Sequence, residues 1–327
     1  MILSKVSANG TGETYTRRYP RSVLKSAEYE LVRESVGLAD RSARGKLRLL
    51  GAEAAEFLEG QVTNDVEALE PGTGCYAALL NHKGKVRADM RVLRGPDWIW
   101  LDTEPEMQAV VESTVRTYGI GRDVREEDVT ESHAILSLLG PESRSALEVE
   151  PAPEEHSFVR AEHGLYVATD LGVDVICATA DADAVRLALG VEPVSEEAAE
   201  CLRVESGRPR LGVDFGGDTI PEEAGLNERA VSFTKGCYVG QETVARLHYK
   251  GRPNRHLRGL RLSDPVPTGT ELYLGDRAVG TVGSVMVSPV HGPIALALVR
   301  REAGPGDELV ARDPRVRATV VELPFAA

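Results

Sequence analysis

One segment of the chain concentrates residues that could do chemistry: Val231–Arg246, which reads VSFTKGCYVGQETVAR. Its core holds a thiol, Cys237, between two glycines, with Lys235 two residues before it and Tyr238 directly after it. A helix is expected over Gln241–His248, and both a helix N-terminus and a nearby ammonium favour the thiolate form of a cysteine. The segment therefore predicts either a reactive thiol or a cysteine that only packs in a glycine-rich turn.

Glu205 is a second candidate, because its position directs a carboxylate toward apolar neighbours. It lies in the last turn of a helix expected over Ser195–Ser206, on the same face as Ala198, Cys201 and Leu202. A carboxylate there opposes the helix dipole by about 0.3–1 kcal/mol, and it needs a partner if it is buried. That partner could be a ligand with adjacent N–H donors, such as a pterin ring edge. The alternative is an ion pair with one of three arginines: Arg203, Arg208 or Arg210.

Asp89 is a third candidate and lies in the alternating segment KVRADMRV. Alternation places Arg87, Asp89 and Arg91 on one face of a strand and the apolar residues on the other. Two arginines on the same face are expected to hold Asp89 ionised. The segment indicates either a solvated polar face or a carboxylate that accepts or steers a proton at a site.

Positive charge gathers between Thr243 and Ser263, in a chain that is acidic as a whole. This basic island has no acidic residue, and it consists of Arg246, Lys250, Arg252, Arg255, Arg258 and Arg261, with His248 and His256. Such an island could attract phosphates or a polyanionic tail. It could equally pair with acidic residues elsewhere in the chain.

Composition limits the classes of function. A length of 327 residues suggests two or three domains, and 38 basic against 51 acidic residues argue against general nucleic-acid binding. No apolar run approaches the 18 or so residues of a membrane span, and the N-terminus lacks a secretory signal, so we expect a cytoplasmic protein. The four cysteines are isolated, which predicts free thiols and no closed metal site. P-loop, hydrolase-elbow, zincin and dinucleotide-binding signatures are missing.

Local patterns predict the elements that must position these residues. Strands are expected at 47–50, 74–80, 85–93 and 97–103, with a hairpin turn at 81–84. A helix capped by Asp102 or Thr103 should end at Gly119. Leu47–Glu53 recurs 89 residues later as Leu136–Glu142, each copy reading strand, glycine turn, helix, which predicts two similar α+β modules. From about residue 255 to 323, short β-rich runs predict a small barrel or sandwich.

Several of these segments resemble one superfamily. Lys235–Glu242, KGCYVGQE, resembles the K-G-C-[FY]-x-G-Q-E signature of the YgfZ-type folate-binding proteins, relatives of the glycine-cleavage T-protein, an aminomethyltransferase. Further segments are similar to superfamily patterns: Phe57–Val66, Leu80–Asp89, Arg203–Pro209 and Ile220–Leu226. Together they span roughly residues 40 to 300.

The resemblance implies an α+β fold with two or more modules in a ring-like arrangement and a C-terminal β-barrel. We expect a first module over residues 1–130, a second over 131–250 interleaved with it, and the barrel over 251–327. The superfamily binds tetrahydrofolate or a one-carbon derivative in a central cavity. By this resemblance, Glu205 matches the glutamate that holds the pterin. Asp89 matches the aspartate that acts on the folate nitrogen, and Ala88 replaces a second acid of the T-protein pattern, which weakens transferase chemistry.

The resemblance also implies a function. The YgfZ branch is associated with folate-dependent assembly or repair of iron–sulfur enzymes and with tRNA modification, so we expect folate and iron–sulfur client proteins as partners. Direct nucleic-acid binding and membrane binding are not expected, and the protein should be a monomer. The alternatives are an aminomethyltransferase and a non-catalytic scaffold with a vestigial folate cavity. The predicted catalytic residues are Cys237 and Asp89, and the predicted ligand-binding residues are Glu205, Lys235, Tyr238 and Arg246.

Overall fold

The computed structural model describes residues 6–7, 14–15, 26–312 and 315–326. The chain divides into two compact units. The two-sheet unit comprises residues 30–196 and 227–243, and the barrel unit comprises residues 1–29, 197–226 and 244–327. Three helices have residues in both units: α1 (Ser26–Glu34), α5 (Glu196–Glu205) and α7 (Gln241–Lys250).

The first sheet of the two-sheet unit is antiparallel and has the strand order β5-β6-β7-β4-β8. Its strands are β4 (Gly45–Leu50), β5 (Thr73–Leu80), β6 (Val86–Arg94), β7 (Trp98–Thr103) and β8 (Arg125–Asp128). Three helical segments accompany it: α2 (Ala54–Glu59), the short 3-10 helix η1 (Pro105–Met107) and α3 (Gln108–Tyr118). The strands expected at 47–50, 74–80, 85–93 and 97–103 and the hairpin turn expected at 81–84 are confirmed.

The second sheet repeats this arrangement, with the order β10-β11-β12-β9-β3. Its strands are β3 (Gly37–Asp40), β9 (His133–Leu139), β10 (Phe158–Ala161), β11 (Gly164–Ala168) and β12 (Gly172–Ala178). The 3-10 helix η2 (Thr179–Asp181) and α4 (Ala182–Leu189) follow β12, as η1 and α3 follow β7. The shared order of four strands agrees with the repeat in the sequence. Because β3 precedes the first sheet, the two sheets are interleaved along the chain.

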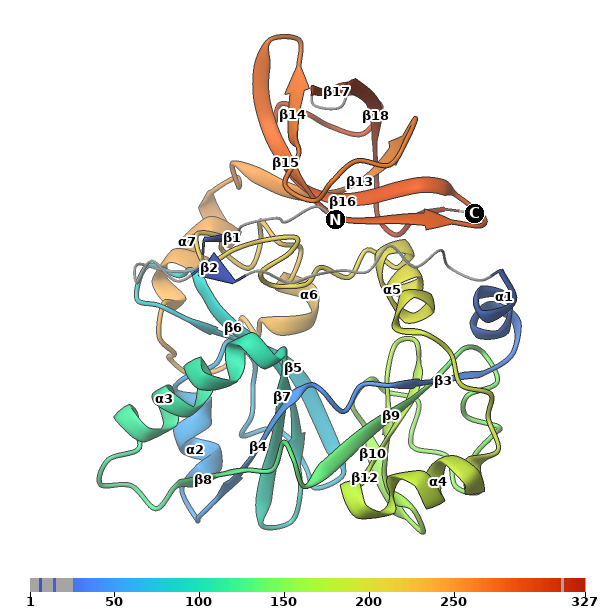
Figure 1. Cartoon of the computed structure of the whole chain (residues 1–327). Helices are drawn as coiled ribbons and strands as arrows, with labels where there is room; N and C mark the ends of the chain where they lie inside the picture. Colours follow the sequence, from blue (N-terminus) through green and yellow to red (C-terminus); the bar gives the residue numbers. More distant parts are fainter. Residues whose placement is uncertain (1–5, 8–13, 16–25, 313–314, 327) are drawn as a thin grey trace. The chain divides into compact units, whose positions relative to one another are not determined.

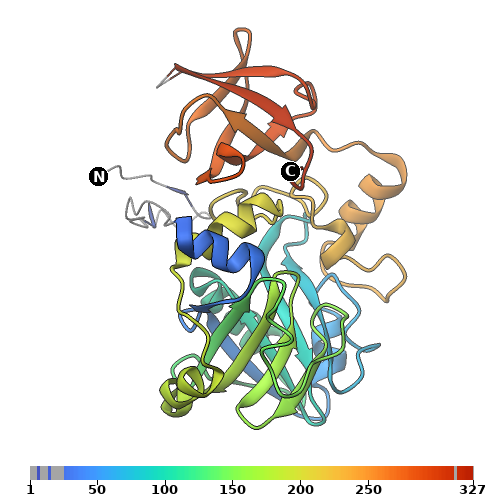
Figure 2. The same cartoon turned by 90° about the vertical axis from the view of Figure 1, so that its right-hand side faces the viewer.

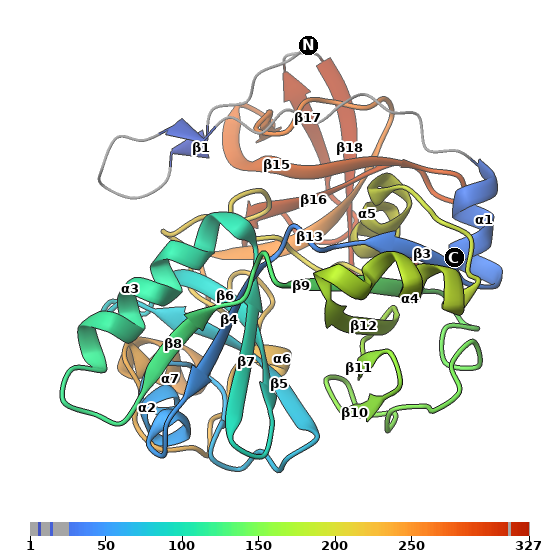
Figure 3. The same cartoon turned by 60° about the horizontal axis from the view of Figure 1, so that its bottom comes forward.

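The two sheets pack face to face. The face of the first sheet that carries Leu93 and Trp100 meets the face of the second that carries Ile135, Leu165 and Ile176. Helices α2 and α3 contribute to the core on the opposite face of the first sheet, and α4 to that of the second. Figure 3 shows these helices outside the sheets, and Figure 2 shows the second sheet in front of the first. Side chains between the sheets are therefore shielded from water on both sides.

The barrel unit contains a closed six-stranded barrel in the order β13-β16-β15-β14-β17-β18, coloured orange to red in Figure 1. Its strands are β13 (Arg255–Leu262), β14 (Glu271–Leu274), β15 (Arg277–Ser288), β16 (Gly292–Arg300), β17 (Glu308–Arg312) and β18 (Arg315–Val321). The barrel expected for the C-terminal region is confirmed. This unit also holds the paired strands β1 (Val6–Ser7) and β2 (Thr14–Tyr15) and most of α5. The described helices, which include α6 (Asn227–Ala230) of the two-sheet unit, are all too short to cross a membrane.

Two local expectations were wrong. The segment after Gly140 forms turns rather than a helix. Asp102 and Thr103 do not cap a helix, because both lie in β7 and are buried, and η1 begins at Pro105 instead. The expectation failed because short polar residues shortly before a proline occur both where a strand ends and where a helix begins, so the local sequence does not distinguish the two. The four cysteines, by contrast, are free thiols as expected.

Candidate functional site

Asp89 is buried between the two sheets, with 3% of its surface exposed, on the same face of β6 as Leu93. The Tyr76 hydroxyl donates a hydrogen bond of 2.7 Å to its Oδ2. Burial raises the pKa of Asp89 to about 6, although the Tyr76 hydrogen bond and the Arg44 guanidinium act in the opposite direction. The carboxyl group can therefore gain or lose a proton close to neutral pH.

The two arginines that were expected to hold Asp89 ionised do not lower its pKa. Arg87 lies at a β-bulge, where the register between β5 and β6 shifts. Arg91 pairs instead with Asp102, at 2.7 Å, and with Asp174, at 2.6 Å. The expectation was wrong because alternation along a strand predicts a shared face and says nothing about partners on the facing sheet.

A buried network of charged residues surrounds this point. Asp102 accepts hydrogen bonds from Arg44, at 2.9 Å, and from Arg91, at 2.7 Å. Burial acts to raise the pKa of Asp102, but the two guanidiniums outweigh it and lower that pKa to about 2. Asp174 accepts from Arg91 and from the Ser137 hydroxyl, at 2.6 Å each. The arginine charges near Asp89 are thus engaged by other acids.

His156 is a buried residue of this region that the sequence patterns did not reveal. Its ring stacks near Tyr76, with centroids 6.4 Å apart, and its backbone adopts a φ of 71°, in the left-handed region. Neither ring nitrogen has a hydrogen-bond partner among the described residues, although Nε2 lies 3.4 Å from a carboxylate oxygen of Glu155. Burial, with the charges of Arg91 and Arg229, lowers the pKa of His156 to about 3. A neutral imidazole therefore lies beside the Tyr76–Asp89 pair.

The side chain of Lys235 is buried and holds a turn of the two-sheet unit. Its ammonium donates hydrogen bonds to the carbonyl oxygens of Glu59, Val62 and Asn64, at 2.7, 2.8 and 2.8 Å. It also lies 3.1 Å from a carboxylate oxygen of Glu59 and 5.2 Å from the ring centroid of Tyr238. Burial lowers the pKa of Lys235, while the pairing with Glu59 opposes this. The signature segment and the turn at 59–64 are thus parts of one substructure.

Two glycines allow the signature segment to approach the hairpin turn at 81–84. Gly240 has a φ of +85°, and a Cβ on it would lie 2.5 Å from the carbonyl oxygen of Asn81. Gly84 has a φ of +74°, and a Cβ on it would lie 2.8 Å from the Cβ of Thr243. Neither position accommodates a side chain without a shift of the backbone. Three segments singled out in the sequence therefore meet in the two-sheet unit.

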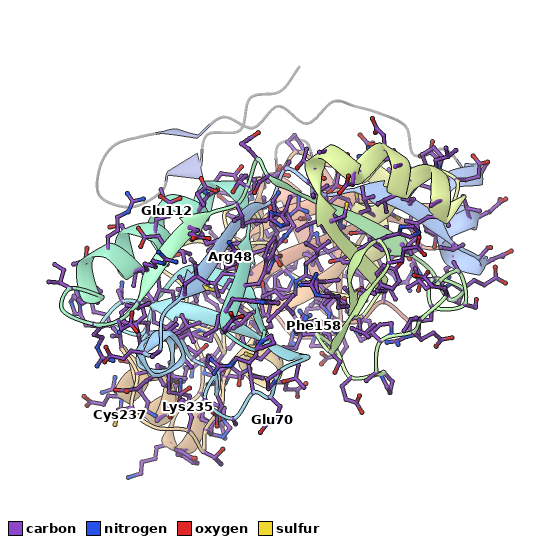
Figure 4. All side chains as sticks on the ribbon, turned by 90° about the horizontal axis from the view of Figure 1, so that it is seen from below. Arg48, Glu70, Glu112, Phe158, Lys235 and Cys237 are labelled. Atoms are coloured by element: carbon purple, nitrogen blue, oxygen red, sulfur yellow. The ribbon has the colours of Figure 1, made fainter. Side chains whose placement is uncertain are left out.

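Cys237 is exposed and lies before α7, which begins at Gln241. Figure 4 labels Lys235 and Cys237 on this same segment. The Lys235 ammonium faces the carbonyl oxygens of the turn, so these contacts do not support the expected effect of Lys235 on the Cys237 thiol. The adjacent Tyr238 is buried, which raises the pKa of its hydroxyl to about 12.

Glu205 belongs to the barrel unit and is only 5% exposed. Its carboxylate accepts hydrogen bonds from the Tyr29 hydroxyl, at 2.9 and 3.1 Å, and from the Ser288 hydroxyl, at 2.5 Å. The Cys201 thiol, one turn earlier on α5, lies 3.6 Å away. The expected inward orientation is confirmed. Arg203, one of the alternative partners, pairs with Glu200 and Asp214 instead.

The basic island divides into paired and exposed residues. Arg255 pairs with Asp218 and Glu223, at 2.9 Å each, and Arg258 with Glu322, at 3.3 Å. Three others are exposed on or just after α7: Arg246, Lys250 and Arg252. This second group keeps its charge available to an anion.

Two family models match the chain. One, described as the GCVT N-terminal domain, covers residues 11–168, and the other, described as the glycine cleavage T-protein C-terminal barrel domain, covers residues 255–326. A protein named aminomethyltransferase from Saccharopolyspora erythraea is 30% identical, over 96% of this chain and 94% of its own length. A probable aminomethyltransferase from Natronomonas pharaonis is also 30% identical, over 91% of this chain and 89% of its own. The chain belongs to the glycine cleavage T-protein family.

The fold agrees with this membership. This T-protein family member is similar to the crystal structure of the glycine cleavage system aminomethyltransferase T from Bartonella henselae, with a TM-score of 0.84. The two sequences are 23% identical, and the match covers 99% of this chain and 94% of the other. The superfamily expected from the sequence motifs is therefore confirmed, and both relatives carry the name aminomethyltransferase. The narrower YgfZ branch and the roles of Asp89, Glu205 and Cys237 stay predictions.

Proposed function

We propose that this T-protein family member is an aminomethyltransferase that transfers a one-carbon unit to tetrahydrofolate. The observation that carries the proposal is Asp89, a buried carboxyl group with one hydroxyl donor and a pKa raised to about 6. A general acid or base works best when its pKa lies near the working pH. The names of the relatives support the same reaction.

Asp89 would exchange a proton at the reacting folate nitrogen. Tetrahydrofolate would supply two nitrogens that bond to the carbon, while the carbon–sulfur bond to the lipoyl carrier breaks to leave a thiol and the amino group leaves as ammonia. The Tyr76 hydroxyl engages Oδ2 of Asp89, so proton exchange falls to Oδ1. Arg229, 4.9 Å above the Tyr76 ring, and His156 beside it hold the aromatic ring in place. Ala88 leaves Asp89 as the single acid of this part of the pattern, so the proton chemistry rests on Asp89 alone.

Glu205 would hold the pterin. The amino-pyrimidine edge of a pterin presents N–H donors, and an inward carboxylate is the acceptor that suits them. Glu205 fits this role, because its carboxylate is buried and accepts hydrogen bonds from the hydroxyl groups of Tyr29 and Ser288. Arg246, with Lys250 and Arg252, would attract the negatively charged glutamyl tail. The contacts of Lys235 and Tyr238 indicate that these two residues support the turn at 59–64 rather than touch the ligand.

Product formation tests the proposal. Purified protein is incubated with tetrahydrofolate and an aminomethyl-loaded lipoyl carrier protein, and methylene-tetrahydrofolate is measured. Wild type should turn over, Asp89→Asn should lose at least a hundredfold in kcat, and Asp97→Asn, an exposed aspartate in the β6–β7 hairpin, should behave as wild type. Tight folate binding without any product would reject the transferase.

One observation favours a second candidate, folate-dependent maintenance of iron–sulfur enzymes. Cys237 is exposed in the K-G-C-Y signature, where a structural cysteine would more often be buried. In this function the thiol would act at the surface, where a client protein can reach it. Cys237→Ala should then fold normally yet fail to restore iron–sulfur enzyme activity in a strain that lacks the gene. Full restoration by Cys237→Ala would remove this candidate.

A further inference from the structure

Ser288 has a hydroxyl group whose hydrogen-bonding capacity is completely used. It lies at the end of β15 and is 2% exposed. Its oxygen accepts from the backbone N–H groups of Val290 and His291, at 3.1 and 3.0 Å. A serine hydroxyl has two lone pairs and one hydrogen, so both lone pairs are occupied by these amides. The single hydrogen is left to donate, and it points to the Glu205 carboxylate at 2.5 Å.

The turn after β15 is itself anchored near the end of α5. The His291 ring lies against that of Phe325, with centroids 5.9 Å apart. The Phe325 backbone N–H donates to the carbonyl oxygen of Glu205, at 2.9 Å. The hydroxyl of Ser288 and the backbone of Glu205 are thus tied to the same small group of residues, all within the barrel unit. This arrangement leaves the Ser288 hydroxyl little freedom to turn away.

The second hydroxyl on Glu205 comes from a distant part of the chain. Tyr29, on α1, reaches both carboxylate oxygens, at 2.9 and 3.1 Å. Tyr29 spans the two oxygens, whereas Ser288 contacts only Oε1. A glutamate side chain that is free to rotate loses conformational entropy when it binds a ligand. Donors on defined oxygens remove that freedom before the ligand arrives.

We propose that Ser288 is a positioning residue for Glu205, which orients the carboxylate toward the hydrogen-bond donors of a pterin edge. The proposal rests on the proposed function, because the pterin is the ligand that Glu205 would hold. Ser288 acts through Glu205 and not by touching the ligand. Its removal should therefore weaken folate binding only in a protein that still carries the carboxylate.

Calorimetric titration with tetrahydrofolate tests this in a double-mutant cycle. Ser288→Ala should raise the Kd about tenfold, since one hydrogen bond to a charged acceptor is lost. In the Glu205→Ala background the same change should have no further effect on Kd. Ser263→Ala removes an exposed serine hydroxyl from the barrel unit and should bind as wild type.

Two conservative variants guard against a merely structural effect. Ser288→Thr keeps a hydroxyl donor, so its Kd for tetrahydrofolate should lie within a fewfold of that of wild type. Ser288→Cys keeps the size of the side chain but offers only a weak donor, so its Kd should match that of Ser288→Ala. Unchanged affinity in Ser288→Ala or Ser288→Cys, or an equal loss with and without Glu205, would overturn the positioning role. Absence of binding in wild type would instead reject the proposed function, so the two failures are distinguishable.

Discussion

Replacing Asp89 by asparagine should stabilise the protein, and more so at high pH than at low pH. Burial raises the pKa of Asp89 from 3.8 to about 6 in the folded state. The folded state therefore binds more protons than the unfolded state between these two values, and the free energy of unfolding falls as pH rises through this window. A pKa difference of about 2 corresponds to about 3 kcal/mol of unfolding free energy, which wild type loses once Asp89 is ionised. The neutral asparagine does not ionise, so the variant keeps this free energy.

Urea unfolding at about pH 4.5 and about pH 8 measures this effect, and about 2 kcal/mol of it should develop between these pH values. From the lower to the higher pH, the free energy of unfolding of Asp89→Asn should rise relative to that of wild type by about 2 kcal/mol. Asp97→Asn, at an exposed position in the turn between β6 and β7, is the control and should show no such change. A difference between Asp89→Asn and wild type that is the same at both pH values would refute the reasoning about burial.

The signature segment provides two further predictions, both measured by urea unfolding. Lys235→Met should lower the free energy of unfolding by about 3 kcal/mol, because three carbonyl oxygens lose their ammonium donor. The exposed control Lys83→Met should lower it by less than about 0.5 kcal/mol, and similar losses in the two variants would contradict the anchoring role. Gly240→Ala should cost more than about 2 kcal/mol, because its Cβ would meet the Asn81 carbonyl at a positive φ. Gly236→Ala has open space around its Cβ and should be tolerated, so equal effects of the two alanines would argue against the close approach.

Much of the fold follows from local patterns, and the exceptions have physical reasons. β6 alternates polar and apolar residues, so its period of two residues identifies it, while β5 and β7 are identified as short apolar and aromatic runs between turn residues. β8 consists of four charged residues, REED, and its place at the sheet edge depends on pairing with β4 rather than on its own pattern. β3 pairs with a strand almost 100 residues later in the chain, a partner that local patterns cannot identify.

The site shows the same division between local and tertiary information. The inward position of Glu205 follows from helix periodicity, and the structure confirms it. The partners of Arg91 lie on β7 and on the second sheet, so the sequence alone predicted the wrong neighbour for it. His156 lies in a loop, where a buried histidine leaves no periodic pattern in the sequence. The signal that marks His156 is its left-handed backbone, which only the three-dimensional structure reveals.

Calorimetric titration of tetrahydrofolate into wild type and into Glu205→Gln tests the central claim most directly. The glutamine keeps the size of the side chain but removes one of the two acceptor oxygens. We predict saturable binding to wild type and at least tenfold weaker binding to the variant, with both proteins folded by their urea unfolding curves. No binding to wild type, or equal affinity for both proteins, would contradict the account.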